Sequence, residues 1–495
     1  MATHEGVTAL TRSDQRSSRA PRRLRLLAAA AAAVLPVVAA CTSGGHPAHS
    51  STAAAPPTAQ ASPATSVPSA SPAPTATGTQ ADWPTYDRTA SRSGVSVTTP
   101  APGRVRKAWT AKVDGAVYAQ PLIVGSTVII ATENDTVFAL AATTGAVRWS
   151  RHLASPVPSG LPCGNVDPSG ITGTPVADTT GGRLWVVTFT AQPSYHHTLW
   201  ALSLASGRTV SQRTIDVAGT DPKAQQQRGA LALLGSRVYV PLGGLYGDCS
   251  DYKGRVVGAP VSGRGPLASF TTDNERQAGI WAPAGEAVQD NSLYVATGNG
   301  MPYDQVADSD SVLRLSPALA VQGRFTPSNF ESLSTGDQDL GSTAPALLPG
   351  GRVFEVGKEG VGYVLDGSRL GGTGGELASA RVCEGGFGGD AVDGSTVVFS
   401  CFRSLRAVQV TGGAKPQLNA RWSLTGGNPG PPIIAGGVVW DVDRNGTLAG
   451  YRLSDGKRVF STRDGAPTTS FPSLAASGTR LVVPAGREVV SFTGI

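Results

Sequence analysis

A repeat of about fifty residues restricts the fold of this chain more than any other feature of its sequence. The clearest unit covers residues 119–150, where four short runs rich in Val, Ile, Thr and Leu are separated by tight turns, as is typical of strands. Weaker copies of the same order begin near Thr174, Gly229, Ala282, Ala344, Gly389, Pro431 and Pro472. A four-stranded sheet cannot bury both faces alone, so these eight units predict an all-β, eight-bladed β-propeller with four-stranded blades.

The two ends of the repeat region indicate how the ring closes. The unit at 470–495 supplies three strands, whereas residues 104–110 form a strand without a blade. We therefore expect residues 104–112 to complete the last blade, which removes two exposed sheet edges. Aromatic residues recur in the outermost strand of several units, and we expect them to pack neighbouring blades together. These residues are Trp109, Trp149, Trp422 and Phe460.

Residues 1–40 have the features of a bacterial export signal. An apolar run from Leu26 to Ala40 follows an Arg-rich stretch and is shorter than the ~20 residues of a membrane-spanning helix. It ends at Val38-Ala39-Ala40-Cys41, which resembles the lipobox of bacterial lipoproteins, where the Cys carries the lipid. Residues 41–82, almost all Ala, Pro, Ser, Thr and Gly, predict a disordered tether. The propeller then covers residues 83–495.

The charge of the chain argues against a nucleic-acid partner. The formal charge of +6 becomes +2 without residues 1–40, since six Arg against Glu5 and Asp14 contribute +4 there. No basic stripe remains for a phosphate backbone. We instead predict a protein anchored to the membrane by lipid on Cys41, at the extracellular face of the cytoplasmic membrane. The excess of Arg over Lys indicates a GC-rich, Gram-positive source.

Four cysteines remain beyond Cys41, and an even number in an exported protein predicts two disulfides. Four positions allow three connectivities. Cys383 and Cys401 flank one predicted hairpin, so we favour that pair and leave Cys163 with Cys249.

The repeat from Trp83 to Ile495 resembles that of the quinoprotein-type β-propellers. This group includes the pyrroloquinoline quinone (PQQ) dehydrogenases and propeller lipoproteins such as the outer-membrane assembly factor. The most specific part is Trp281, followed eighteen residues later by Asn299 in Thr-Gly-Asn-Gly and then by Gly336-Asp337-Gln338-Asp339. As a lipoprotein, the chain is most similar to the PQQ-binding-like repeat proteins of Gram-positive bacteria.

The resemblance implies roles for three residues. In the enzymes of this group, the Trp stacks under the planar quinone, the Asn amide oxygen ligates Ca²⁺, and the Asp acts as ligand and base. By that analogy Trp281, Asn299 and Asp337 form the central site. An aromatic plate suits a flat cofactor, and Ca²⁺ takes oxygen ligands.

Three features depart from the enzymes, one of which is that the haem-binding motif Cys-x-x-Cys-His is absent from the sequence. Their vicinal Cys pair corresponds here to Pro162-Cys163, and Asp248 or Asp251 stands where they have a calcium-binding Glu. The departures favour a binding or scaffold module without a cofactor, which holds a protein or small-molecule ligand at the propeller face. The alternative is a dehydrogenase that uses PQQ and Ca²⁺ to oxidise an alcohol or sugar.

An adjacent histidine pair is a further candidate for chemistry. His196-His197 falls in a predicted hairpin of the second blade, and adjacent strand residues point to opposite faces. We therefore expect an exposed loop pair rather than a metal site. The nucleophile motif Gly-x-Ser-x-Gly is absent from the sequence.

Overall fold

The structure is a computed structural model that describes residues 82–463 and 467–495. All of them belong to one compact unit. The predicted signal segment 1–40, the lipidation site Cys41 and the tether up to residue 81 lie outside the described residues. Within the described ranges, no helix has the length and apolar character that a bilayer span requires.

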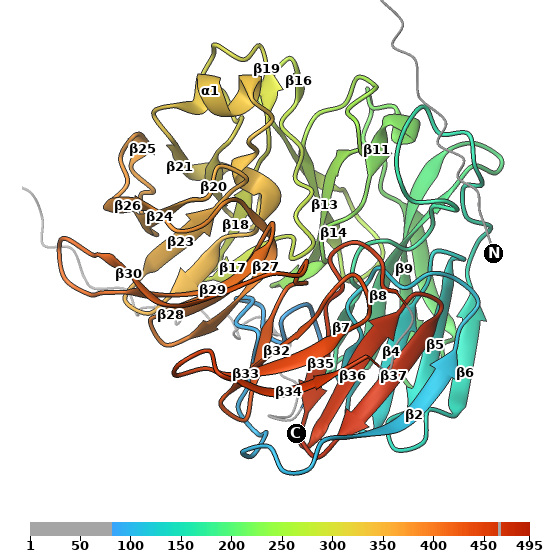
Figure 1. Cartoon of the computed structure of the whole chain (residues 1–495). Coiled ribbons are helices and arrows are strands. Elements are labelled where there is room, and N and C mark those ends of the chain that lie inside the picture. Colours follow the sequence, from blue (N-terminus) through green and yellow to red (C-terminus); the bar gives the residue numbers. More distant parts are fainter. Residues whose placement is uncertain (1–81, 464–466) are drawn as a thin grey trace, which may run out of the picture. The chain divides into compact units, whose positions relative to one another are not determined.

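Eight four-stranded antiparallel sheets form the blades of a β-propeller, as the repeat predicts (Figure 1). Blades 1 to 4 consist of β3 (Leu122–Val124), β4 (Thr127–Ala131), β5 (Thr136–Ala141) and β6 (Val147–His152); β7 (Val176–Asp178), β8 (Arg183–Thr190), β9 (His196–Ser203) and β10 (Thr209–Thr214); β12 (Ala232–Leu234), β13 (Arg237–Gly244), β14 (Arg255–Pro260) and β15 (Ala268–Thr271); and β17 (Ala287–Gln289), β18 (Ser292–Ala296), β20 (Val312–Leu315) and β21 (Val321–Thr326).

Blades 5 to 8 continue the same order. They consist of β22 (Ala346–Leu348), β23 (Arg352–Val356), β24 (Val361–Asp366) and β26 (Ala378–Arg381); β27 (Gly386–Asp393), β28 (Thr396–Cys401), β29 (Ser404–Val410) and β30 (Leu418–Thr425); β31 (Ile433–Ala435), β32 (Val438–Val442), β33 (Leu448–Arg452) and β34 (Arg458–Thr462); and β35 (Ala475–Ser477), β36 (Arg480–Ala485), β37 (Glu488–Thr493) and β2 (Arg106–Lys112).

Short elements supplement the blades. They are β1 (Val95–Ser96), parallel to β31; β11 (Gln225–Gln226), paired with β13; β16 (Arg276–Gln277), paired with β19 (Gly300–Met301); β25 (Gly372–Thr373), parallel to β21; the helix α1 (Phe330–Thr335); and 3₁₀ turns at Pro222–Ala224 and Leu340–Ser342.

The ring closes as predicted. Strand β2, from the N-terminal side, pairs antiparallel with β37 from the C-terminus, and Trp109 lies opposite Ser491. The first and last parts of the described chain therefore share blade 8, coloured blue and red in Figure 1. The N-terminal strand that has no blade of its own therefore supplies the fourth strand of blade 8.

Neighbouring blades are joined by apolar cores and by docked tryptophans. Clusters of buried apolar residues combine strands of adjacent blades, such as β8 and β13. The Trp149 indole donates a hydrogen bond to the Leu204 carbonyl of blade 2 at 3.1 Å and lies over Gly207. A side chain at Gly207 would overlap that ring, so the turn requires glycine. Trp109 and Trp422 dock in the same way over the next blade, which confirms their predicted role.

Both favoured disulfides are present. Cys383 and Cys401 are bonded with a Cα separation of 6.4 Å, and Cys163 is bonded to Cys249 with a Cα separation of 6.1 Å. The first bond lies within blade 6, where Cys401 ends β28 and Cys383 precedes β27. The second joins the loop after blade 1 to the loop after β13.

Residues 82–96 close one end of the central channel, a feature that the repeat does not predict. This segment, here called the plug, bonds to the innermost strands of blades on all sides of the ring; it is blue at the middle of Figure 1. Backbone hydrogen bonds join Trp83 to Ile123, Pro84 to Ala177, Ala90 to Val288, Ser93 to Val392 and Gly94 to Ile434.

A buried arginine holds the plug to the ring. The Arg92 guanidinium is 3% exposed, and it donates to the carbonyls of Glu286 at 2.8 Å and Leu231 at 3.0 Å. Beside it, burial raises the pKa of Asp87 to about 8, although a hydrogen bond from Gln120 and the charge of Arg92 oppose the shift. The plug therefore carries buried ionisable groups in the middle of the propeller.

Candidate functional site

The end of the channel opposite the plug carries the predicted site residues. The plug bonds to residues within the innermost strands, whereas Trp281 precedes β17 and Phe471 precedes β35. These two rings lie 6.3 Å apart between centroids, and Phe387 lies 6.2 Å from Phe471. The Arg228 guanidinium lies 5.8 Å from the Phe471 ring and is 8% exposed. Aromatic and cationic side chains thus form a layer across the channel at this end.

Above this layer, five residues form a cluster that we call the mouth: Trp281, Asn299, Asp337, Asp339 and Lys358. Asn299 lies in the loop after β18, both aspartates follow α1, and Lys358 lies in the turn between β23 and β24. The turns that carry them belong to blades 4 and 5. Trp281 is partly exposed, so the mouth is open to solvent.

An ion-pair network centres on Lys358. Its ammonium lies 2.7 Å from Asp337 Oδ1, 2.7 Å from Asp339 Oδ2 and 5.7 Å from the centroid of the Trp281 ring. Asn299 donates its side-chain amide to Asp337 at 3.0 Å and its backbone N–H to Asp339 Oδ1 at 2.7 Å. The structure therefore brings together all three of the residues that the resemblance implied, through a lysine that the sequence did not indicate.

The charges of the mouth are unequally exposed. The Lys358 and Asp339 side chains are 19% and 11% exposed, whereas Asp337 is 74% exposed. Burial alone would lower the pKa of Lys358, but attraction to Asp339 and hydrogen bonds to both aspartates outweigh it and raise the pKa. The lysine is therefore held charged between two carboxylates, and the local charge is negative.

A buried carboxyl supports the loop that carries the aspartates. Asp310 accepts hydrogen bonds from the Ser334 hydroxyl at 2.6 Å and from the Leu340 N–H at 3.0 Å. Burial raises the pKa of Asp310 to about 7, with a further contribution from Asp339. This bracket fixes the segment between α1 and β22, and thus the positions of Asp337 and Asp339.

Asp248, the proposed substitute for the calcium-binding Glu, faces the same region. It accepts a hydrogen bond from the Tyr252 hydroxyl at 2.5 Å. Burial raises the pKa of Asp248, and the charges of Asp339 and Asp337 add to the shift. Asp248 bonds to no residue of the mouth; its neighbour Asp251 is 93% exposed and pairs with Arg276 at 3.6 Å.

The residues fit a Ca²⁺ ion in donor type but not in arrangement. Asn299 Oδ1 is buried without a hydrogen-bond partner, and carboxylates are the ligands that Ca²⁺ prefers. The position between the two carboxylates, however, is taken by the Lys358 ammonium. No set of three His, Cys, Asp or Glu side chains in the described ranges could hold a metal ion. An anionic quinone would also meet net negative charge here, so we derive no step through PQQ or Ca²⁺.

The prediction that His196 and His197 form an exposed loop pair was wrong, although they do lie at a hairpin of blade 2. Both residues belong to β9, and His197 is 1% exposed, stacked 4.4 Å from the Phe189 ring. Each imidazole contacts a different oxygen of Asp216 through its Nδ1 atom. Successive side chains of a strand point to opposite faces. This alternation does not separate the two Nδ1 atoms, which lie close to the backbone and reach the same carboxylate.

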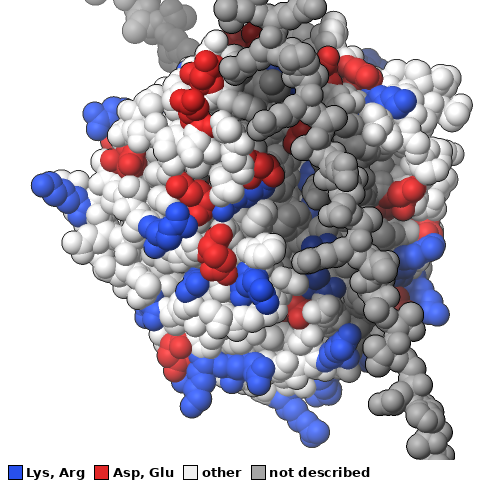
Figure 2. Space-filling view, turned by 45° about the horizontal axis from the view of Figure 1, so that its top comes forward, with Lys and Arg blue, Asp and Glu red and all other residues white. Residues whose placement is uncertain are grey.

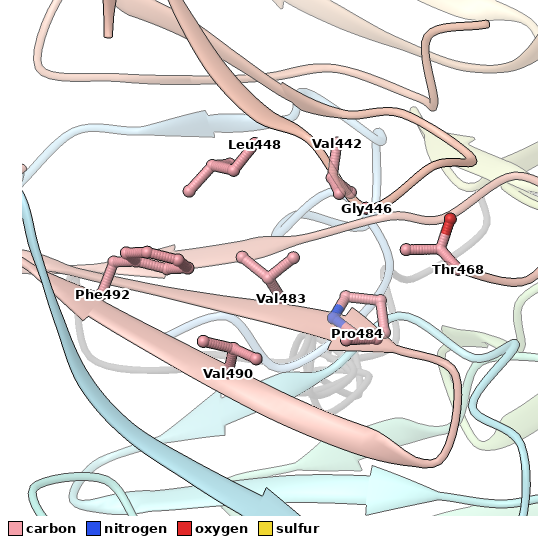
Figure 3. Close-up of a pocket in the computed structure, with 9 residues that line it drawn as sticks. Val442, Gly446, Leu448, Thr468, Val483, Pro484, Val490 and Phe492 are labelled. Carbon is pink, nitrogen blue, oxygen red and sulfur yellow. The ribbon is translucent and has the colours of Figure 1, made fainter. Parts of the chain in front are cut away.

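A small pocket and the charged surface complete the description of the molecule. The apolar pocket of Figure 3 lies between blades 7 and 8 and has a cavity volume of about 10 Å³, at the lower limit for one water molecule. It is a packing gap rather than a ligand site. On the face shown in Figure 2, acidic and basic side chains are interspersed over most of the surface.

The fold is an eight-bladed β-propeller that matches the fold of quinoprotein dehydrogenases. Residues 89–305 match the family described as outer membrane protein assembly factor BamB. No curated protein sequence matches the chain.

Solved structures of two functional kinds share this fold. The chain resembles a quinohemoprotein alcohol dehydrogenase from Comamonas testosteroni, with a TM-score of 0.62 and 16% identity over 83% of this chain and 80% of that one. A europium-containing methanol dehydrogenase gives 0.62 and 13% over 84% and 98%. BamB from Moraxella catarrhalis gives 0.52 and 12% over 79% and 98%. At these identities, the structural likeness shows a shared fold.

Proposed function

We propose that the protein is an extracellular, lipid-anchored binding module and that the mouth is its ligand site. The observation that carries this proposal is the Lys358 ammonium held between Asp337 and Asp339 beside the partly exposed Trp281 ring. Paired in this way, the carboxylates are positioned as hydrogen-bond acceptors rather than as a free base. The plug and the aromatic layer close the channel below them.

The chemistry of the mouth suits a neutral ligand rich in hydroxyl groups, such as a sugar or polyol. The flat indole offers an apolar surface to a ring, and the exposed oxygens of Asp337 accept hydrogen bonds from hydroxyls. A few fixed polar groups beside an aromatic surface are typical of small-molecule sites. The negative local charge disfavours anionic ligands.

Calorimetric titration with a panel of neutral mono- and disaccharides tests this function. We expect saturable binding to the wild type and a loss of at least tenfold in affinity in Trp281→Ala. Trp281→Phe is the matched control, because it keeps an aromatic plate and should retain most of the affinity. Absence of saturable heat with every member of the panel would refute the proposed ligand class.

The anchor is proposed from the sequence at Cys41 and requires its own test. Cys41→Ala should release the protein from the membrane fraction into the medium. Retention of the variant on membranes would show that another element holds it there.

A PQQ-dependent dehydrogenase is the second candidate function, because Asn299 Oδ1 is buried and unpartnered beside Asp337 and Trp281. The solved dehydrogenases share the fold. This function requires Lys358 to leave the carboxylates. Dye-linked oxidation of alcohols or sugars that depends on added PQQ and Ca²⁺, and that is abolished by Asp337→Ala, would establish it in place of the binding module.

A further inference from the structure

The hairpin between β8 and β9 of blade 2 (Figure 1) carries a chain of three polar side chains that is separate from the mouth. Ser194 Oγ lies 2.7 Å from His196 Nε2, and His196 Nδ1 lies 3.1 Å from Asp216 Oδ2. The hydroxyl and the carboxylate therefore contact opposite nitrogens of one imidazole. This is the connectivity of a nucleophile, a general base and an orienting carboxylate.

Exposure decreases from Ser194 through His196 to Asp216, as catalysis by these three side chains requires. Ser194 is exposed at the tip of the hairpin, the His196 side chain is 38% exposed, and the Asp216 side chain is 15% exposed. The hydroxyl can thus meet a solute, while the carboxylate is shielded from water. A partly shielded carboxylate holds an imidazole in one orientation more strongly than an exposed one does.

Asp216 is fixed independently of His196. Its carboxylate contacts His197 Nδ1 at 3.2 Å and accepts the His197 backbone N–H at 3.2 Å. His197 is itself held by stacking on Phe189. Although burial favours protonation, the hydrogen bonds from His197 and its charge lower the pKa of Asp216, so the carboxylate is ionised at neutral pH.

The backbone N–H groups of Ser194 and Tyr195 lie beside the nucleophile in the sequence. Within the described part of the chain, the N–H groups of Ser194 and Tyr195 donate to no backbone carbonyl outside the strand ladders. Donors next to a nucleophile can stabilise the negative charge that forms on an attacked carbonyl oxygen. Lys223, 5.3 Å from the centroid of the Tyr195 ring, adds a positive charge near the tip.

We propose that Ser194, His196 and Asp216 form an esterase-type site, in which Ser194 is the nucleophile, His196 the general base and Asp216 a positioning residue. Ser194 is exposed at the hairpin tip, and we infer small carboxylic esters as the substrates. It needs neither metal nor cofactor and does not depend on the function proposed for the mouth.

The reaction balances as ester hydrolysis. Ser194 Oγ forms a bond to the carbonyl carbon, and its proton moves to His196 Nε2. The alcohol leaves with that proton, and an acyl group remains on Ser194. Water then attacks the acyl carbon with His196 as base, which releases the carboxylic acid and restores the serine.

Covalent labelling of the full chain with a fluorophosphonate tests the proposal. The Ser194 oxygen displaces fluoride, and mass spectrometry of the peptides locates the phosphoryl group. We expect one adduct, on Ser194, together with hydrolysis of p-nitrophenyl acetate above the buffer rate. Ser194→Ala should abolish both. Ser206→Ala, a surface serine elsewhere in blade 2, is the matched control and should react like the wild type.

Variants of the other two residues separate chemistry from structure. His196→Gln should slow labelling by about 10²-fold or more, the usual contribution of a general base. Asp216→Asn should slow labelling as well, because it keeps an acceptor oxygen but removes the carboxylate. Asp216→Glu should restore part of the rate, because it returns a carboxylate. A purely structural role would need only the acceptor oxygen. Circular dichroism of each variant confirms folding. Labelling of wild type at the level of Ser194→Ala, or an adduct that His196→Gln leaves unchanged, would overturn the proposal.

Discussion

Replacing Lys358 with methionine should lower the free energy of unfolding by about 3 kcal/mol. Methionine keeps the length of the side chain and removes the ammonium that lies 2.7 Å from both Asp337 and Asp339. Removing one partner of a fully buried ion pair costs ~3–5 kcal/mol of stability. Lys358 and Asp339 are slightly exposed, so the cost here should lie at or below the lower end of that range. The pair with the exposed Asp337 adds at most ~1 kcal/mol.

Guanidinium unfolding, followed by tryptophan fluorescence, measures the change. Lys457→Met is the matched control, since Lys457 is exposed and its loss should alter stability by less than ~0.5 kcal/mol. In a double-mutant cycle with Asp339→Asn, the coupling energy should exceed ~1 kcal/mol. A Lys358→Met variant as stable as Lys457→Met, with coupling near zero, would refute the pairing.

The loss of unfolding free energy in Lys358→Met should decrease at high pH. The pKa of Lys358 is raised in the folded protein, so its pair contributes fully below the unfolded lysine pKa of ~10.4 and is lost as pH rises through the higher folded value. The difference between wild type and Lys358→Met should therefore be constant from about pH 7 to 9 and shrink above about pH 10.

Three further perturbations address the fold. Gly207→Ala should cost about 1–3 kcal/mol more in unfolding free energy than Gly182→Ala, because both have positive φ but only the first places a Cβ against the docked tryptophan ring; equal losses would argue against docking. Between pH 6 and 8 the wild type should lose about 2 kcal/mol more unfolding free energy than Asp87→Asn, since a buried acid with a pKa of about 8 keeps a proton that the unfolded chain has lost. Parallel pH profiles of the two proteins would contradict this. Loss of the Cys163–Cys249 bond, which spans 86 residues, should cost about 4–5 kcal/mol in the chain-entropy model, measured by thermal unfolding of the double serine variant; an unchanged midpoint would exclude it.

The sequence predicts those features that its period encodes. Blade number, ring closure through Trp109 and the docking tryptophans all follow from the spacing of strand-like runs. The plug does not follow, because residues 82–96 have no periodicity and their partners are the inner strands of distant blades. Burial of His197 depends on stacking with Phe189 and on Asp216 in a neighbouring segment, and neither signal is local.

The mouth is an intermediate case. Trp281, Asn299 and Asp337 could be selected because their spacing matches a known pattern. Lys358 could not be selected, because it lies in the next blade and a lone lysine in a turn carries no signal. Its position changes the interpretation, since the ammonium takes the place between the carboxylates that a metal ion would need.

Titration of the wild type and Lys358→Met with Ca²⁺, in the presence and absence of PQQ, tests the assignment of the mouth most directly. If Lys358 fills the cation position, calorimetry should show no saturable Ca²⁺ binding to the wild type and stoichiometric binding to Lys358→Met, whose carboxylates are unpaired. Stoichiometric binding of Ca²⁺ and PQQ to the wild type would contradict the account and favour the dehydrogenase.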